Sequence, residues 1–186
     1  MSLRIMHIST RLILGGSQEN TVLSCEGQAD DGHTVSLVYG PIHGPEGSLL
    51  ERARGHGGIE CIETPDLVRE LAPARDRRCL RDLGRLIERW RPDVVHTHSS
   101  KAGILGRMAA WSQRVPAVIH TIHGLAFHPY QAAWRNAIYI TAERFAARRC
   151  HRILCVADAM RDQALAAGIG SREQYDTMRW GMDTTA

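Results

Sequence analysis

The chain has 186 residues, of which 44% are hydrophobic and 23% charged, and its formal net charge is +3 at pH 7. This length suits one globular domain, and the balance of apolar and charged residues excludes a disordered chain. No apolar run approaches the roughly 18 residues that a membrane span needs, so the sequence predicts no transmembrane helix.

The first residues and the cysteines indicate a reducing, cytoplasmic setting. Met1 to Arg4 lead directly into an apolar run, which leaves no room for the charged and apolar regions of a signal peptide. The five cysteines contain no Cys-x-x-Cys pair, so we interpret them as free thiols rather than as a disulfide framework or a zinc site. We therefore expect a cytoplasmic protein.

Short apolar runs alternate with segments of helical periodicity along the whole chain. This alternation is typical of βαβ units and predicts an α/β fold, a single Rossmann-like domain whose parallel sheet is flanked by helices. With right-handed crossovers, a strand order of 3-2-1-4-5-6 places the switch point beside the first strand. The expected strands are 3–8, 34–39, 59–63, 93–97, 116–121 and 152–156, and the expected helices are 17–31, 48–54, 75–91, 100–112, 131–149 and 158–168.

A pair of glycines separates the first predicted strand from the first predicted helix. Gly15 and Gly16 carry no Cβ, and the helix that begins at Ser17 directs its dipole toward them, so backbone N–H groups there can bind an anion. The loop lacks the G-x-G-x-x-G spacing of dinucleotide-binding folds, and no acidic residue ends the second strand. The pattern therefore predicts a phosphate site and disfavours an NAD-dependent oxidoreductase.

Residues 75–91 form the most basic segment, with seven arginines against three acidic residues and a local charge of +4. Its apolar residues recur at helical spacing, which is typical of a core-packed helix with a solvated basic face. The alternative is a helix resting on anionic lipid headgroups, to which each basic side chain adds about 1 kcal/mol. Nucleic acid is disfavoured, because only 5% of the residues are aromatic and no DNA- or RNA-binding module is recognisable.

Histidines gather at the carboxyl ends of the fourth and fifth predicted strands, where parallel sheets bind ligands. His96 and His98 end one strand, and His120 and His123 end the next. A metal is disfavoured because no carboxylate or thiolate accompanies these imidazoles, and we expect His96 and His120 to be satisfied within the sheet. His123 differs, since Gly124 follows it and allows the chain to turn away.

Two further segments border this edge of the predicted sheet. Phe127 and Tyr130 lie in an aromatic loop that is a candidate substrate wall, although aromatic residues also pack beneath ordinary loops. Ser99 and Lys101 lie at the start of a helix, where their roles would be capping or contact with a polar ligand. Asp158 is the expected N-cap of the last helix.

Five motifs together resemble a known family. In their order and spacing the chain is similar to the N-terminal half of the family 4 glycosyltransferases, the retaining GT-B group. The motifs are Gly15-Gly16, Ala-Asp-Asp-Gly-His-Thr-Val at 29–35, Arg-Pro-Asp-Val-Val-His-Thr-His at 91–98, Thr-Ile-His-Gly at 121–124 and Gly-Met-Asp at 181–183.

The resemblance implies two Rossmann-like domains that face each other across a cleft. The N-terminal domain binds the acceptor, the C-terminal domain binds the nucleotide sugar, and no metal or cofactor is required. The glycine loop would touch the donor diphosphate, and the histidine matching His123 lies at the reacting sugar. His123 is therefore the expected catalytic residue, and the expected substrate-binding residues are Gly15, Gly16, Ser17, His98, Ser99, Lys101, Gly124, Phe127 and Tyr130.

The same resemblance sets expectations for domains and partners. Residues 1–180 would form the acceptor-binding domain and residues 181–186 the start of the interdomain linker, with the donor domain absent and the isolated chain inactive. The partners would be a nucleotide-sugar donor and a lipid-linked, polysaccharide or other acceptor, with peripheral contact at the inner face of an anionic membrane. A non-catalytic, flavodoxin-like module that binds a phosphorylated small molecule is the alternative.

Overall fold

The computed structural model describes residues 1–42 and 45–179, so the Gly-Met-Asp motif at 181–183 and the expected linker lie outside the described residues. The helices and strands alternate as predicted, with most bounds within two residues of those expected. The strands are β1 (Arg4–Ser9), β2 (Thr34–Tyr39), β3 (Ile59–Glu63), β4 (Val94–His98), β5 (Ala117–Ile122), β6 (Arg152–Cys155) and β7 (Tyr175–Thr177). The helices are α1 (Gly16–Asp30), α2 (Leu50–Gly55), α3 (Pro73–Trp90), α4 (Ser100–Ser112), α5 (Ala133–Ala147) and α6 (Asp158–Ala166), with a 3₁₀ turn at Arg172–Gln174.

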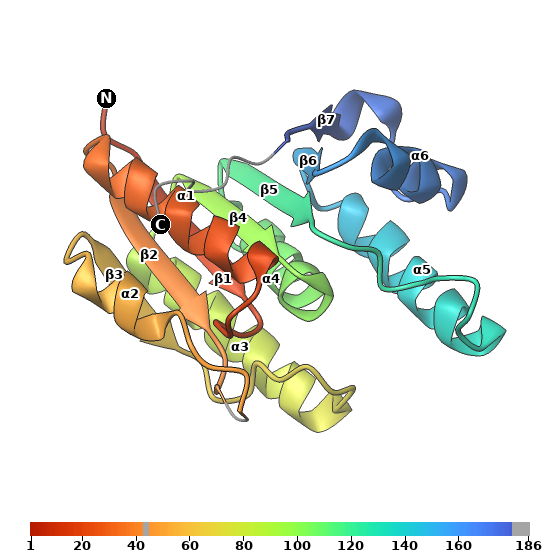
Figure 1. The fold of residues 1–186 in the computed structure, drawn as a ribbon, viewed down its shortest axis with the longest axis horizontal. Coiled ribbons are helices and arrows are strands. Elements are labelled where there is room, and N and C mark those ends of the chain that lie inside the picture. The colour runs from red at the N-terminus through yellow and green to blue at the C-terminus, as the bar shows by residue number, and fades with distance from the viewer. Residues whose placement is uncertain (43–44, 180–186) are drawn as a thin grey trace.

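All the strand pairs are parallel, in the order β3-β2-β1-β4-β5-β6-β7 (Figure 1). The predicted doubly wound order is therefore confirmed, and β7 extends it by one edge strand. The sequence pattern did not predict β7, because its three residues include only one large apolar side chain, Tyr175, and no alternating run. The order reverses between β1 and β4, which are adjacent in the sheet.

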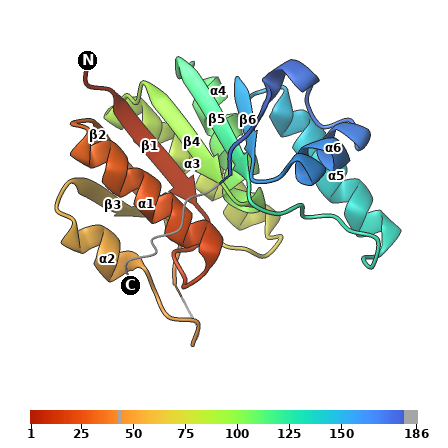
Figure 2. The same ribbon diagram turned by 45° about the horizontal axis from the view of Figure 1, so that its top comes forward.

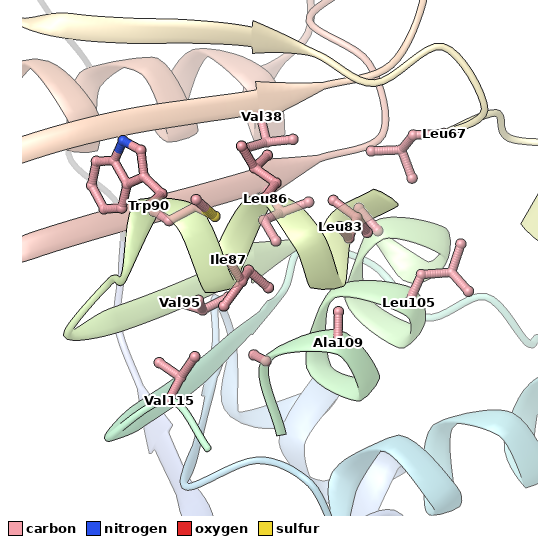
Figure 3. Close-up of a cluster of buried hydrophobic side chains, with 14 of the residues drawn as sticks. Val38, Leu67, Leu83, Leu86, Ile87, Trp90, Val95, Leu105, Ala109 and Val115 are labelled. Atoms are coloured by element: carbon pink, nitrogen blue, oxygen red, sulfur yellow. The ribbon is translucent and has the colours of Figure 1, made fainter. Parts of the chain in front are cut away.

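Helices cover both faces of the sheet, and α1 lies on the face opposite α3 and α4 (Figure 2). On the α3 and α4 side, Leu83, Ile87 and Trp90 of α3 pack with Leu105 and Ala109 of α4 (Figure 3). Burying each large apolar side chain of this kind stabilises the fold by about 1.5–3 kcal/mol. The apolar stripe predicted in the basic segment therefore packs in the main core.

The two faces of each central strand have different surroundings, because successive side chains point to opposite sides. Met6 and Ile8 of β1 join the cluster beneath α3 and α4. Leu37 of β2 packs in a second cluster with Val22 and Cys25 of α1. A third cluster lies between β6, β7, α5 and α6.

The start of α6 differs from the sequence-based expectation by one residue. Ala157, rather than Asp158, occupies the N-cap position of α6, so the predicted cap is one residue off. Asp158 is instead the first helical residue, and its Oδ1 accepts hydrogen bonds from Arg161 at 2.6 Å and from Thr177 Oγ1 at 2.8 Å. The side-chain contact thus ties the start of α6 to β7.

Candidate active site

The carboxyl ends of β1, β4 and β5 lie together at the point where the strand order reverses. Loops leaving neighbouring strands diverge at such a point, so this edge is where an open parallel sheet binds its ligands. Most of the residues singled out in the sequence are found here, and their surroundings differ.

His123 directly follows β5 and lines a small cavity of about 20 Å³. Ser99, Gly124 and Phe127 line the same cavity, so four of the expected site residues are brought together. A cavity of this volume accommodates about one water-sized group. It therefore offers space for a single hydroxyl beside the imidazole rather than for a whole sugar.

A larger depression of about 560 Å³ adjoins this cavity, and Ser99 and Ser100 line both. Arg11 and Gln18 contribute polar groups to it, and Lys101 lies on its wall. This volume is in the range of sites that bind small molecules. The edge of the sheet therefore has room for a ligand with both polar and charged groups.

A row of histidine side chains runs from the interior to the small cavity. His7 Nδ1 lies 2.9 Å from His98 Nε2, and His98 Nδ1 lies 3.0 Å from His123 Nε2. At the inner end, His7 Nε2 lies 2.7 Å from Gln28 Oε1 on α1. Hydrogen bonds therefore connect a helix residue to His123 through two buried rings.

Burial keeps these rings neutral at pH 7. Loss of solvation lowers the pKa of His7 to about 4, although the hydrogen bond to Gln28 Oε1 opposes the shift. Burial also lowers the pKa of His123 to about 4. The pKa values of His96 and His98 are held well below 6.5 by burial first and by neighbouring histidines second.

His7, His96 and His98 each offer a ring nitrogen within 4.8 Å of the others, which is close enough to hold a metal ion. Hydrogen bonds already use the facing nitrogens of His7 and His98, and His96 Nε2 lies 2.7 Å from Thr121 Oγ1. A metal would have to displace such a bond, so the hydrogen-bonded arrangement fits these residues better.

His120 points toward α4 on the other face of the sheet from His96, although it lines the small cavity together with His123. Its Nδ1 lies 3.1 Å from the carbonyl oxygen of Thr97, and a Cβ added to Gly103 of α4 would stand 2.5 Å from its ring. The alternation of side chains along β5 explains this placement, since Thr121 faces His96. As expected, both His96 and His120 have hydrogen-bond partners within the sheet.

The glycine loop has the open geometry that an approaching anion needs. Gly15 is extended at φ 173°, a conformation that any residue adopts, and α1 begins at Gly16. A Cβ added to Gly16 would meet no atom within 4 Å. Gly15, Gly16 and Ser17 line neither of the two cavities described above, whereas Gln18, one residue further along α1, lines the larger one.

The start of α4 is held by Thr10, which directly follows β1, and the side chain of its N-cap residue makes no capping hydrogen bond within the helix. Ser99 occupies the cap position in a left-handed conformation (φ 61°), and its Oγ lies 2.7 Å from Thr10 Oγ1. Thr10 Oγ1 in turn accepts the backbone N–H of Ala102. Lys101 Nζ donates to both carboxylate oxygens of Asp76 at 2.6 Å, so much of its charge is balanced by α3.

The aromatic loop divides into a packed and an exposed part. Phe127 lines the small cavity and packs against the third core cluster, whereas Tyr130 is 96% exposed. His7 and Gln28, which complete the hydrogen-bonded row, were not among the residues predicted from the sequence. The available signal was the position of His7 in the first strand, directly opposite His96 once β1 and β4 pair.

Among the described residues, no helix combines the length and apolar character needed to cross a bilayer.

Comparison with known proteins gives two relatives by sequence and a solved structure with the same fold. An Escherichia coli protein, UDP-Gal:alpha-D-GlcNAc-diphosphoundecaprenol alpha-1,3-galactosyltransferase, is 31% identical over 154 residues, 83% of this chain and 38% of that protein. A Sodalis glossinidius UDP-N-acetylglucosamine--N-acetylmuramyl-(pentapeptide) pyrophosphoryl-undecaprenol N-acetylglucosamine transferase is 43% identical over 56 residues, 30% of this chain and 16% of that protein. A solved glycosyltransferase from Rickettsia africae shares the fold, with a TM-score of 0.67 at 15% identity over 98% of this chain and 44% of that one.

The matched segments cover less than half of each of these proteins. Residues 15–179, which contain the glycine loop, His98, His123 and every residue that lines the small cavity, match a single family description. The resemblance expected from the sequence motifs is thereby confirmed. The chain belongs to the glycosyl transferase 4-like domain family.

Proposed function

We propose that this chain is the acceptor-binding domain of a retaining glycosyltransferase that moves a sugar from a nucleotide-sugar donor to a lipid-linked diphosphate acceptor. The observation that carries the acceptor class is a continuous depression that is polar at one end and apolar at the other. The larger depression at Arg11 and Ser99 shares Ile104, Ile138 and Ala142 with a groove of about 590 Å³ between α4 and α5.

The two ends of this depression suit the two parts of a lipid diphosphate. Met108 and Phe145 line the groove, which has an almost wholly apolar character. At the polar end, Arg11 and Arg69 supply positive charge, although Arg11 also pairs with Glu46 at 3.0 Å. A lipid diphosphate would place its phosphates beside the arginines, where the charges are complementary, and its hydrocarbon chain along the apolar groove. Both curated relatives carry an undecaprenyl diphosphate in their names, which supports this class.

The donor's binding groups lie on a further domain in this proposal. The chain covers 38% of the galactosyltransferase, and the family resemblance assigns the nucleotide sugar to a second Rossmann-like domain. The transition state resembles an oxocarbenium ion with charge developing on the leaving diphosphate, so positioning and anion stabilisation dominate the chemistry. His123 would orient the reacting sugar, and the backbone at Gly15 and Gly16 would face the diphosphate. The non-catalytic module is not favoured by the family match.

We also propose peripheral contact with an anionic membrane on the cytoplasmic side. The basic segment by itself is a weaker candidate than the sequence indicated, because Arg75 and Arg78 bind Asp66 at 3.1 and 2.8 Å. Leu71 and Trp134, each 61% exposed, lie at one surface depression with Arg69 and Arg135. This combination of apolar and basic side chains beside the groove would bring a membrane-borne acceptor to the site.

Binding of geranylgeranyl diphosphate to the 186-residue chain tests the acceptor class. Below its micelle-forming concentration, we expect it to bind at least tenfold more tightly than either geranylgeraniol or inorganic diphosphate. Ile138→Asp should weaken it by about tenfold or more, which corresponds to 1.4 kcal/mol. Met178→Asp, at an exposed apolar residue away from the groove, is the matched control. Equal affinity for the alcohol and the diphosphate would contradict the proposal.

Sugar transfer is tested with two proteins, the 186-residue chain alone and the complete enzyme that also contains the donor-binding domain. The chain alone should not turn over a nucleotide sugar above a denatured control, because the proposal assigns the donor-binding groups to a further domain. In the complete enzyme, His123→Ala should lower kcat by roughly tenfold to a thousandfold with little change in nucleotide affinity. Near-normal kcat with weakened donor binding would reduce His123 to a binding residue.

A further inference from the structure

We propose that Gln28 fixes the tautomer of His123 through His98 and His7, so that His123 presents an unprotonated Nδ1 to the substrate. This inference rests on the proposed role of His123 at the reacting sugar, and it adds a positioning residue that lies two imidazoles away. The geometry behind it is the unbroken row of contacts at 2.7, 2.9 and 3.0 Å that links Gln28 Oε1 to His123 Nε2.

Gln28, at the inner end of the row, determines which nitrogen donates in each of the hydrogen bonds. A carbonyl oxygen accepts hydrogen bonds and cannot donate, so the proton between Gln28 Oε1 and His7 Nε2 belongs to the imidazole. A neutral imidazole carries one N–H, which leaves His7 Nδ1 as an acceptor. His98 must therefore donate from its Nε2 to His7 Nδ1.

The same condition, one N–H on each neutral ring, also fixes the hydrogen bond nearest the cavity. With its proton on Nε2, His98 offers Nδ1 as an acceptor, and His123 donates to it from Nε2. His123 then has its lone pair on Nδ1. Each hydrogen bond contains one proton and each ring contributes one, so no other arrangement of neutral rings satisfies all three contacts while Gln28 accepts.

Burial keeps the imidazole rings of the row uncharged. His7 is fully buried and His98 is 2% exposed, and burial lowers the pKa values of both below 6.5. His96 lies beside the row, with its ring centre 4.2 Å from that of His98, but its Nε2 is engaged with Thr121. The row is therefore a single path with Gln28 at one end.

The consequence for ligand binding is a defined polarity at the small cavity. A ring with Nδ1 as acceptor favours a ligand group that donates, such as a sugar hydroxyl, over one that only accepts, such as a carbonyl or ester oxygen. If every hydrogen bond in the row exchanged its donor and acceptor, this preference would be inverted although no ring had moved. Gln28 thus acts on specificity through hydrogen-bond direction rather than through contact.

Nitrogen-15 NMR of the histidine-labelled 186-residue chain tests the proposal, because protonated and bare ring nitrogens give widely separated signals. In the wild type, His7, His98 and His123 should all be protonated on Nε2. Gln28→Glu keeps an accepting oxygen and should leave His123 as it is. Gln28→Lys provides only donors and should move the His123 proton to Nδ1. Gln113→Lys, at the exposed end of α4, is the control and should change nothing.

Two results would overturn the proposal: a proton on Nδ1 of His123 in the wild type, or an Nε2 proton that persists in folded Gln28→Lys. If the lysine variant does not fold, the wild-type spectrum alone decides the direction. In the complete enzyme, Gln28→Glu should retain more of kcat than Gln28→Lys. The NMR result does not depend on turnover, so failure of glycosyl transfer and failure of the tautomer assignment are distinguishable.

Discussion

Acidification should destabilise this domain at a pH well above that at which its carboxylates titrate. His7 and His123 have pKa values of about 4 in the fold, against 6.5 for an unburied histidine, because burial penalises the charged ring. Between pH 6.5 and 4 the unfolded chain takes up these protons and the folded chain does not. The stabilisation is therefore complete above pH 6.5 and is lost as the pH falls toward 4.

The size of the effect follows from the shifts. Each unit of pKa shift corresponds to 1.36 kcal/mol, so the two rings together account for up to about 7 kcal/mol. Burial shifts the pKa values of His96, His98 and His120 in the same direction. A domain of this size is stable by roughly 5–15 kcal/mol, so the loss of this contribution between pH 6.5 and 4 removes a large share of its stability.

Urea unfolding followed by circular dichroism at pH values from 7.5 to 4.5 measures the effect. Each histidine that titrates in the unfolded chain alone should add about 1.4 kcal/mol per pH unit to the slope of the unfolding free energy. His7→Gln retains a donor and an acceptor but cannot titrate, and it should reduce the slope. His128→Gln, at an exposed loop position, is the matched control. An unfolding free energy that is constant between pH 7 and 5 would refute the reasoning.

Three further predictions concern packing, charge and membrane contact. A Cβ on Gly40 would collide with the carbonyl oxygens of Leu67 and Thr10, so Gly40→Ala should lower the free energy of unfolding, measured with heat or urea, by about 3 kcal/mol. The control is Gly27→Ala on α1, where the added Cβ meets open space and should stabilise the fold by about 0.5–1 kcal/mol. Arg107 and Glu143 form a buried ion pair at 2.6 Å, so Glu143→Ala should cost about 3–5 kcal/mol, and the double change to Met at both positions should cost less; equal losses would show that the unpaired charge is not the cause. In co-sedimentation with vesicles rich in acidic lipid, Leu71→Asp with Trp134→Asp should reduce binding more than Arg85→Glu with Arg89→Glu, and the reverse order would return the contact to the basic face of α3.

The fold was largely predictable because its signals are local. Apolar runs of five or six residues and helical spacing in 75–91 mark the elements, and the right-handed crossover rule then leaves few possible strand orders. The last strand, Tyr175–Thr177, was missed because a three-residue edge strand gains its stability from pairing with β6 and carries almost no pattern of its own.

The candidate site was less predictable because its contacts depend on strand register. His7 and His96 are 89 residues apart in the chain, and nothing local indicates that they are directly opposite each other in the sheet. The sequence also placed His120 with the other histidines; it does line the small cavity with His123, but the alternation along β5 turns it away from His96 and toward α4. Lys101 was considered as a ligand contact, and its ion pair with Asp76 depends on the packing of α4 on α3.

The histidine row also bears on how the central strands find their alignment during folding. A slip of one residue between β1 and β4 would turn His7 into the apolar cluster that holds Met6 and Ile8, and would leave its ring nitrogens without partners. A slip of two that set His7 opposite Val94 would keep the correct face but separate His7 from His98. Apolar strands tolerate such shifts far more readily, since one branched side chain packs much like another. The hydrogen bonds between these histidines therefore help to specify the register of two strands that are distant in the chain. The ligand-binding edge can form only after β1 and β4 have paired in that register.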